Sequence, residues 1–311
     1  MKERNNIKIS LIIPVFNIEK YVYKCLCSVV EQTKMPDEVI IIDDCSQDKT
    51  SIICDEFSKK YSFIKTIHLT QNGGVSKARN VGIEVSNGKY LLFIDGDDIL
   101  SKYYVEKILD NIEKFKADLL IGNYTTAENY LDQFENCCIK NNINNMKAEE
   151  FRTKLALGEK EGYLWNKLFK RNIIIDNQLK FDERLELFED LKFVYQYVMN
   201  SDTVIEIPDV IYWYRTRIDS AVHQLYSGKR WQQYCVIKYI LNNEKQDSKE
   251  LNNLLIFYAW MYLNSSVNLN ENDRKKIVLK DIKKIFFKTN IPYNIKQLNN
   301  LGLIEPSVRH G

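Results

Sequence analysis

The first 125 residues alternate between short apolar runs and segments whose apolar residues recur at helical spacing. The apolar runs lie at 9–16, 39–42, 63–69, 90–94 and 119–122, and the helical segments lie near 21–30, 50–60, 75–85 and 103–115. A continuous apolar run is typical of a strand buried on both faces. Strands that alternate with helices predict an α/β fold, with a mostly parallel sheet flanked by helices on both faces.

The rest of the chain has a different character. Residues 126–160 are polar and rich in Asn, which indicates a loop or a loosely packed insertion. Residues 161–225 combine aromatic and charged side chains, a mixture that suits a surface cleft. After residue 226 the pattern is helical to the end. We therefore predict a domain at 1–225, with halves at 1–125 and 126–225, and a helical C-terminal region at 226–311.

Composition excludes several classes of protein. The 44 Lys and Arg against 42 Asp and Glu leave a net charge of +2, too weak a field to indicate a nucleic-acid partner. The longest apolar stretch, 254–263, is about half of a membrane span. Seven cysteines without an export signal favour neither a disulfide framework nor a zinc site. We expect a reduced, cytoplasmic protein.

Two of the predicted strands run directly into acidic loops. The strand at 39–42 precedes Asp43-Asp44-Cys45-Ser46, and the strand at 90–94 precedes Asp95-Gly96-Asp97-Asp98. Ligands of open parallel sheets bind at the carboxyl ends of strands. Neighbouring carboxylates repel by about 1 kcal/mol in water and about 4 kcal/mol at an effective dielectric of about 20. Mg²⁺ or Mn²⁺ would remove this repulsion, and Gly96 would let the backbone bend so that Asp95 and Asp97 share one pocket.

The same acids have a plainer interpretation as solvated loop residues or helix N-caps, and Asp98 is placed to cap a following helix. An EF-hand is excluded, because Ile99 and Leu100 occupy positions that require an oxygen ligand and a glycine. Neither a glycine-rich dinucleotide turn nor a GxxxxGK[ST] loop is present. Residues 73–80 offer a weak phosphate-binding pattern at a helix start.

Four segments, in order and spacing, resemble the inverting family 2 glycosyltransferases, which have the GT-A fold. They are Ile12-Ile13-Pro14-Val15-Phe16-Asn17, Ile42-Asp43-Asp44-Cys45-Ser46, Gly74-Val75-Ser76-Lys77-Ala78-Arg79-Asn80 and Phe93-Ile94-Asp95-Gly96-Asp97-Asp98. Later matches are Leu164-Trp165-Asn166-Lys167-Leu168, Phe188-Glu189-Asp190 and Tyr212-Trp213-Tyr214-Arg215 up to Ser220. The resemblance covers about 7–225. Cys45 departs from it, because the family most often has glycine there.

The resemblance implies a nucleotide-sugar donor, usually a UDP-sugar. Pro14, Val15 and Phe16 would form the wall of the base site, and Asp44 would accept the N3–H of uracil. Asp95 would lie near the ribose and the metal, and Asp97 would be the principal ligand of Mn²⁺ or Mg²⁺. Arg79 would contact phosphate or base, with an exposed helix arginine as the alternative.

The resemblance also implies where the transfer reaction takes place. Asp190 would be the general base for the acceptor hydroxyl, oriented by Glu189, with a plain helix start as the alternative for the pair. Trp165, Asn166 and Lys167 would line the acceptor side, with a packed core Trp as the alternative. Arg215 would belong to a loop that closes over the diphosphate with Arg217, Ser220 and His223, excluding water.

Three interpretations of the function stay open at this stage. The first is a glycosyltransferase that extends a bacterial surface glycan, a glycoprotein or a lipid-linked sugar. The second is a polyprenyl-phosphate sugar synthase, and the third is a non-catalytic partner that binds a sugar nucleotide. The basic segment 273–288 fits either contact with the inner face of an anionic membrane or a packed helix with a solvated lysine face. A homodimer is also left open.

Overall fold

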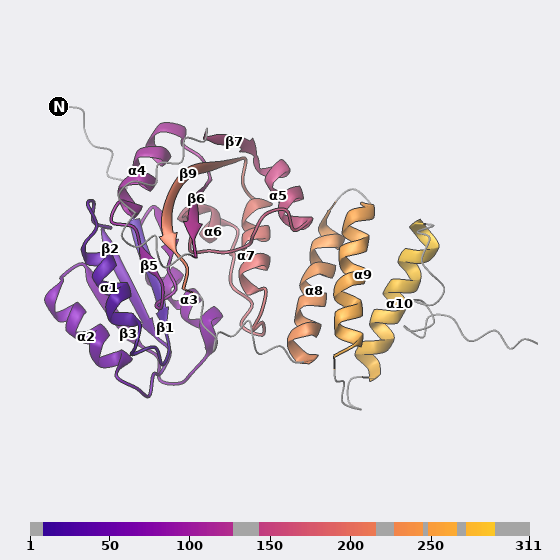
Figure 1. Ribbon diagram of the computed structural model, residues 1–311, viewed down its shortest axis with the longest axis horizontal. Helices are drawn as coiled ribbons and strands as arrows, with labels where there is room; N and C mark the ends of the chain where they lie inside the picture. Colours follow the sequence, from indigo (N-terminus) through magenta and orange to yellow (C-terminus); the bar gives the residue numbers. More distant parts are fainter. Residues whose placement is uncertain (1–8, 127–142, 216–226, 245–247, 266–271, 290–311) are drawn as a thin grey trace, which may run out of the picture. The chain divides into compact units, whose positions relative to one another are not determined.

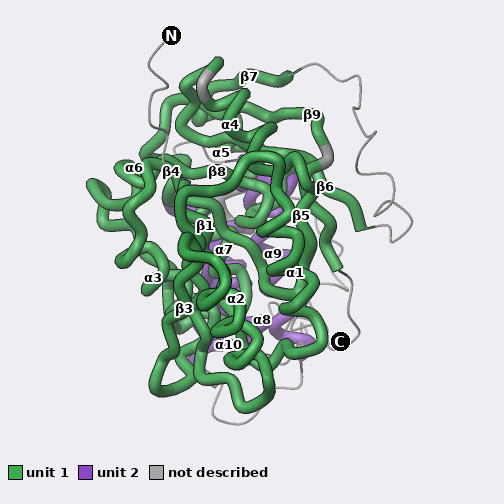
Figure 2. The backbone as a smooth tube through the Cα atoms, turned by 90° about the vertical axis from the view of Figure 1, so that its left-hand side faces the viewer, with its two compact units in different colours: residues 1–155, 160–218 green, residues 156–159, 219–311 purple. Residues whose placement is uncertain are grey.

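The structure is a computed structural model that describes residues 9–126, 143–215, 227–244, 248–265 and 272–289. It contains two compact units (Figure 2): unit 1 is Met1–Leu155 with Lys160–Ile218, and unit 2 is Ala156–Glu159 with Asp219–Gly311. The boundary that we predicted at 225 lies outside the described residues, as do the loop residues Arg217, Ser220 and His223. All other predicted site residues belong to unit 1.

Unit 1 is built on one twisted sheet with the strand order β3-β2-β1-β4-β8-β6-β9-β5, and β7 also pairs with β9. Its first four strands in the chain are parallel: β1 (Ile9–Val15), β2 (Glu38–Asp43), β3 (Ile64–His68) and β4 (Tyr90–Phe93). They alternate with α1 (Val22–Val30), α2 (Thr50–Lys60) and α3 (Gly74–Val85), and α4 (Tyr104–Phe115) follows (Figure 1). The predicted α/β fold is confirmed.

The two faces of this parallel sheet carry separate apolar clusters. Leu11 and Ile13 of β1 pack on the side of α1, α2 and α4, in the main core. Ile40 and Ile42 of β2 face the other way and pack with Ala78 of α3. Because successive strand residues point to opposite faces, burial on both sides requires the unbroken apolar runs seen in the sequence.

The second half of the sheet contains β6, which we predicted at 119–122, and strands β5, β7, β8 and β9 from residues that we had not assigned to strands. β8 (Lys167–Lys170) lies antiparallel between β4 and β6 (Leu119–Thr125), and β9 (Thr203–Trp213) runs parallel to β6. The short strands β5 (Ile99–Leu100) and β7 (Asn144–Lys147) pair antiparallel to β9. Because β8 runs against β4 and β6, its first residue reaches the edge where β4 and β6 end. Residues 165–167 therefore share an edge with Asp95.

An aromatic cluster fixes helix α7 (Glu189–Val198) on the sheet. Phe193 of α7 stacks on Phe181 at 4.0 Å between ring centroids, and its ring meets Phe93 and Phe169 edge to face. All four rings are buried. Buried aromatic pairs of this kind contribute about 0.5–1.5 kcal/mol each beyond the area they bury. The first turn of α7, which carries Glu189 and Asp190, is thereby held in place.

Unit 2 is helical in its described residues. It contains α8 (Ser227–Asn243), α9 (Lys249–Leu263) and α10 (Asn272–Thr289), which is the basic helix predicted at 273–288. Val278, Ile282 and Ile285 of α10 are buried, and Asp281 accepts hydrogen bonds from Tyr234 and Lys238 of α8. This apolar side of α10 is packed inside the unit. No helix in the described ranges has the length and apolar character to cross a membrane.

Candidate active site

The carboxyl end of β2 carries two aspartates with separate sets of partners. Asp43 binds the backbone N–H of Ser46 and lies 2.8 Å from Nδ1 of His68. Asp44, 3% exposed, accepts the backbone N–H groups of Gly73 and Gly74, each at 2.8 Å. Asp44 thus fixes the start of α3. Each carboxylate oxygen has a second lone pair, so its contact with uracil stays a prediction.

His68, the last residue of β3, is a partner of Asp43 that no motif marks. Its Nδ1 pairs with Asp43, and its Nε2 lies 3.0 Å from Asp55 of α2. The hydrogen bond to Asp43 raises the pKa of His68 above its usual value, against the opposing effect of burial. The imidazole therefore links the end of β3 to Asp43 of β2 and to Asp55 of α2. A histidine at the end of a strand gives no sequence signal for this role.

The backbone after Asp44 explains the departure from the family pattern at Cys45. Cys45 has φ 65°, in the left-handed region. Glycine enters this region without steric cost, whereas other residues clash there with their own backbone. The turn that glycine usually makes is therefore retained, with a strained cysteine in its place.

The loop after β4 holds its three aspartates in different environments. Asp98 is 1% exposed and accepts hydrogen bonds from the Tyr212 hydroxyl at 2.7 Å and the Arg215 amide at 2.8 Å. Burial, followed by the charges of Asp95 and Asp97, raises the pKa of Asp98 to about 8. Asp98 does not cap a helix, because β5 follows it and α4 begins only at Tyr104.

Gly96 is required in this loop for a reason other than the one we predicted. Its φ is not in the left-handed region. A Cβ at Gly96 would instead lie 2.7 Å from Val15 and from Ile18. Glycine thus allows the acidic loop to pack against the end of β1, where Phe16 is 44% exposed. The ring of Phe16 is thus accessible, and its contact with a nucleotide base stays a prediction.

Arg79 of α3 joins the acidic loop to the start of α7. It is 5% exposed, so the exposed-helix alternative is wrong. Its Nη2 lies 3.1 Å from Asp95 and its Nη1 lies 2.9 Å from Glu189. Although burial opposes its charge, these carboxylates raise the pKa of Arg79. One guanidinium thus aligns residues from two separate predicted motifs.

Asp190 lies half-buried beside this ion-pair network. Burial, followed by the charge of Glu189, raises its pKa to about 7, and Arg79 acts in the opposite direction. Its Oδ1 accepts the N–H of Leu191 at 2.6 Å. A carboxylate with a pKa near neutrality is suited to general base catalysis, since it can both take up and release a proton.

The predicted acceptor residues Trp165, Asn166 and Lys167 are all buried, at 4%, 5% and 1% exposed. Lys167 Nζ donates to the carbonyls of Glu161 and Tyr163 and to Oδ1 of Asn166, at 2.7–3.1 Å. These bonds use all three N–H groups of an ammonium. Burial lowers the pKa of Lys167 to about 7, opposed first by Asp190. The lysine therefore holds the loop 161–166 in its conformation through these hydrogen bonds.

The exposed member of the adjoining aromatic stack is Tyr163, which sequence reasoning missed. The Trp165 ring stacks on Tyr212 at 4.5 Å and on Tyr163 at 5.0 Å. Trp165 has little open surface, whereas Tyr163 is 38% exposed. Tyr163 therefore presents an exposed aromatic face at the end of this stack. Contact of Trp165 itself with an acceptor stays a prediction.

The chemistry of the acidic loop fits a divalent cation. No group of three Asp, Glu, His or Cys side chains stands ready to hold a metal in the described ranges. Mg²⁺ and Mn²⁺ need no such group, because one or two carboxylates usually hold the ion together with substrate phosphates. Asp95 and Asp97 provide hard oxygen donors, and their charges contribute to the raised pKa of Asp98. Arg215 closes the loop through its Nε, 2.9 Å from the Asp97 carbonyl.

Comparison with known proteins decides the family. The model of Glycosyl transferase family 2 matches residues 10–173, more than half of the chain. The chain belongs to this family. Family 2 relatives include EpsH, a putative glycosyltransferase of Bacillus subtilis, with 30% identity over 81% of this chain and 75% of EpsH. The glycosyltransferase GlyA of Streptococcus pneumoniae is 31% identical over 68% of this chain, which spans only 31% of GlyA.

A solved structure extends the likeness of this family 2 chain to three dimensions. Residues 1–349 of Staphylococcus aureus TarS, solved in complex with UDP-GlcNAc, superpose with a TM-score of 0.68. The match covers 88% of this chain and 80% of that one, at 23% identity. At this identity the similarity shows a shared fold, and the GT-A architecture predicted from the motifs is confirmed.

Proposed function

We propose that this chain transfers a sugar from a UDP-sugar to a hydroxyl of a glycan acceptor, with inversion at the anomeric carbon and with Asp190 as general base. The observation that carries the proposal is the placement of Asp190, whose pKa is raised to about 7. Its neighbour Glu189 is tied through Arg79 to Asp95 of the acidic loop. A base of suitable pKa is thereby linked to the expected donor site.

The donor side of the proposal rests on three features. Phe16 presents an exposed ring for the base, Asp44 lies at the start of α3, and the Asp95–Asp98 loop follows β4. UDP is the nucleotide that we favour, because the similar TarS structure was solved with UDP-GlcNAc. Asp97 and Asp95 would hold Mn²⁺ or Mg²⁺. When bound, the cation would neutralise the charge that develops on the diphosphate.

The transfer step is a single in-line displacement. The acceptor oxygen forms a bond to the anomeric carbon while the bond from that carbon to the diphosphate oxygen breaks. The hydroxyl proton passes to the carboxylate of Asp190, and UDP leaves with the bonding electron pair. Glu189 and Arg79 keep Asp190 oriented, and such base catalysis typically contributes about 10²–10⁴-fold.

The acceptor that we propose is a bacterial surface glycan. The relatives point in this direction, because the TarS relative is named as a poly(ribitol-phosphate) β-N-acetylglucosaminyltransferase. A location in the cytoplasm or at the inner face of the membrane, and a homodimer, remain predictions.

A donor screen tests this function. UDP release is measured with UDP-glucose, UDP-galactose and their N-acetyl forms, with Mn²⁺ or Mg²⁺ present. We expect one donor to be preferred, and we expect Asp190→Asn and Asp97→Asn to lose most of the turnover. Asp110→Asn is the matched control, since Asp110 is an exposed aspartate paired only with Lys34 across the described residues. Equal turnover in all four proteins would refute the assignment, and NMR of the glycoside that forms when an acceptor glycan is added would test inversion.

A further inference from the structure

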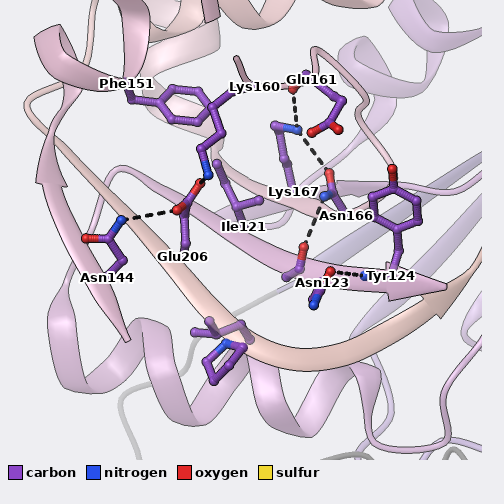
Figure 3. A pocket seen from close by; sticks show the side chains of 13 residues that line it. Ile121, Asn123, Tyr124, Asn144, Phe151, Lys160, Glu161, Asn166, Lys167 and Glu206 are labelled. Atoms are coloured by element: carbon purple, nitrogen blue, oxygen red, sulfur yellow. Dashed lines mark hydrogen bonds and ion pairs between the residues drawn. The ribbon is translucent and has the colours of Figure 1, made fainter. Parts of the chain in front are cut away.

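A polar cavity of about 320 Å³ opens beside the site just described. It lies between β6, β9 and α5 (Ala148–Ala156), and the loop before β8 forms another wall (Figure 3). Side chains at its surface include those of Asn144, Phe151, Lys160, Glu161 and Glu206. Its volume is near the lower end of the range of about 300–1,000 Å³ for small-ligand sites, which suits a single sugar ring.

The cavity adjoins the proposed base. Residues 160, 161, 166 and 167 line it, and the same loop packs on the first turn of α7. A Cβ at Gly162 would lie 2.5 Å from Cα of Leu191, the residue after Asp190. The charge of Asp190 also acts on Lys167, where it is the largest of the effects that raise the lysine pKa against burial. A ligand in the cavity would therefore lie close to the acceptor hydroxyl.

The polar groups of the cavity alternate between donors and acceptors. Lys160 Nζ lies 2.6 Å from Oε1 of Glu206, and Nδ2 of Asn144 donates to Oε2 of Glu206 at 3.2 Å. Sugar hydroxyls both donate and accept, so such an arrangement can bind them. The Phe151 and Tyr124 rings that also line the cavity supply apolar surface for the C–H face of a sugar.

The charges of the cavity argue against an anionic ligand. Lys160 is neutralised by Glu206, and Lys167 directs its N–H groups to protein carbonyls and Asn166. Glu161 adds a carboxylate at the rim. Both lysines among the described residues that line the cavity are thus already engaged, whereas proteins usually bind phosphate with available Arg, Lys or helix N-termini.

We propose that this cavity is a subsite for one neutral sugar residue of the acceptor, adjacent to the residue that receives the transferred sugar. The subsite rests on the proposed function, and it makes the acceptor a neutral glycan at this position. A polyol phosphate would not be accommodated there.

Ligand-observed NMR on the full chain with UDP and Mg²⁺ tests the subsite. The neutral probes are the methyl glycosides of glucose, galactose, N-acetylglucosamine and N-acetylgalactosamine, and ribitol 5-phosphate is the anionic probe. We expect at least one glycoside to bind, with affinity about tenfold weaker in Glu206→Gln, which replaces a charged acceptor by a weaker neutral one, and in Asn144→Ala, which removes the side-chain amide. Asn200→Ala, an exposed asparagine on the same unit, is the control and should bind like the wild type.

Three results would overturn the subsite: no glycoside binds, the variants bind as well as the wild type, or ribitol 5-phosphate displaces the glycoside. UDP affinity is measured on the same samples, because a misfolded variant would lose UDP binding as well. If one variant is misfolded in this way, the other variant tests the subsite. Failure of the subsite can be told from failure of the proposed function. If the protein turns over UDP-sugars but both variants bind the glycoside as well as the wild type, only the subsite is refuted.

Discussion

Arg79 donates to the carboxylate of Glu189 at 2.9 Å, although 110 residues separate them in the chain. The same guanidinium binds Asp95, so the helix after β3 ties the acidic loop after β4 to the first turn of α7. Arg79 therefore acts as a positioning residue between the two halves of the candidate site.

Replacing Arg79 should alter the pH dependence of the reaction. Arg79 lowers the pKa of Asp190, against the effects of burial and Glu189. In Arg79→Met that pKa should rise, and the midpoint of kcat/KM against pH should move upward, because activity needs ionised Asp190. Lys77→Met, an exposed lysine on the same helix, is the control. A profile that does not move in Arg79→Met would exclude the coupling.

Asp190 should lower the stability of the fold at alkaline pH. Its folded pKa of about 7 lies above the unfolded value of about 3.9, so the folded state binds more protons between these values. Stability should therefore fall as pH rises through this window. Asp190→Asn removes the effect: its midpoint of thermal unfolding should exceed that of the wild type at pH 8 and match it below pH 4. Equal midpoints at pH 8 would contradict the buried, ionisable carboxylate.

Lys167 should be required for folding more than for catalysis. Lys167→Met leaves two part-buried carbonyls and the buried side chain of Asn166 without their donor, and a buried unsatisfied group costs roughly 1–3 kcal/mol. Urea unfolding should show a loss of roughly 2 kcal/mol or more. Lys154→Met, which breaks an exposed pair with Glu150, should cost less than about 1 kcal/mol. Similar losses in the two variants would contradict this role.

Glycine, the residue that the family most often has at position 45, should give a more stable protein than the cysteine that stands there. Its φ of 65° is strained for cysteine, so Cys45→Gly should raise the free energy of unfolding by up to about 1 kcal/mol. Cys45→Ala keeps the Cβ and should show no gain. Urea unfolding of the two variants decides the point, and a gain in both would show that the thiol, not the backbone, causes the strain.

The parallel half of the sheet could be predicted because its strands are buried on both faces. Ile9–Val15 and Glu38–Asp43 read as apolar runs, so periodicity alone finds them. The Lys167–Lys170 strand has only Leu168 and Phe169 between two lysines, which gives no strand signal. Lys167 is buried because its strand lies between β4 and β6, which come from distant parts of the chain. Local pattern could not reveal such a strand.

The sequence predicted which motifs form the candidate site, but not the contacts between them. Asp95 and Glu189 were named from their motifs, whereas the bridge between them depends on Arg79, whose partners lie 16 and 110 residues away. Tyr163 and His68 stand in no motif that marks them. Their roles follow from exposure and pairing, which exist only in the folded chain.

Calorimetry of UDP binding tests the central claim most directly, namely that the acidic loop after β4 holds a cation-bound nucleotide diphosphate. Titrations are made with and without Mn²⁺ on the wild type, Asp97→Asn and the control Asp110→Asn. The account predicts tight UDP binding that needs Mn²⁺ and is lost in Asp97→Asn but kept in Asp110→Asn. UDP binding that is indifferent to both Mn²⁺ and Asp97, or no UDP binding at all, would contradict it.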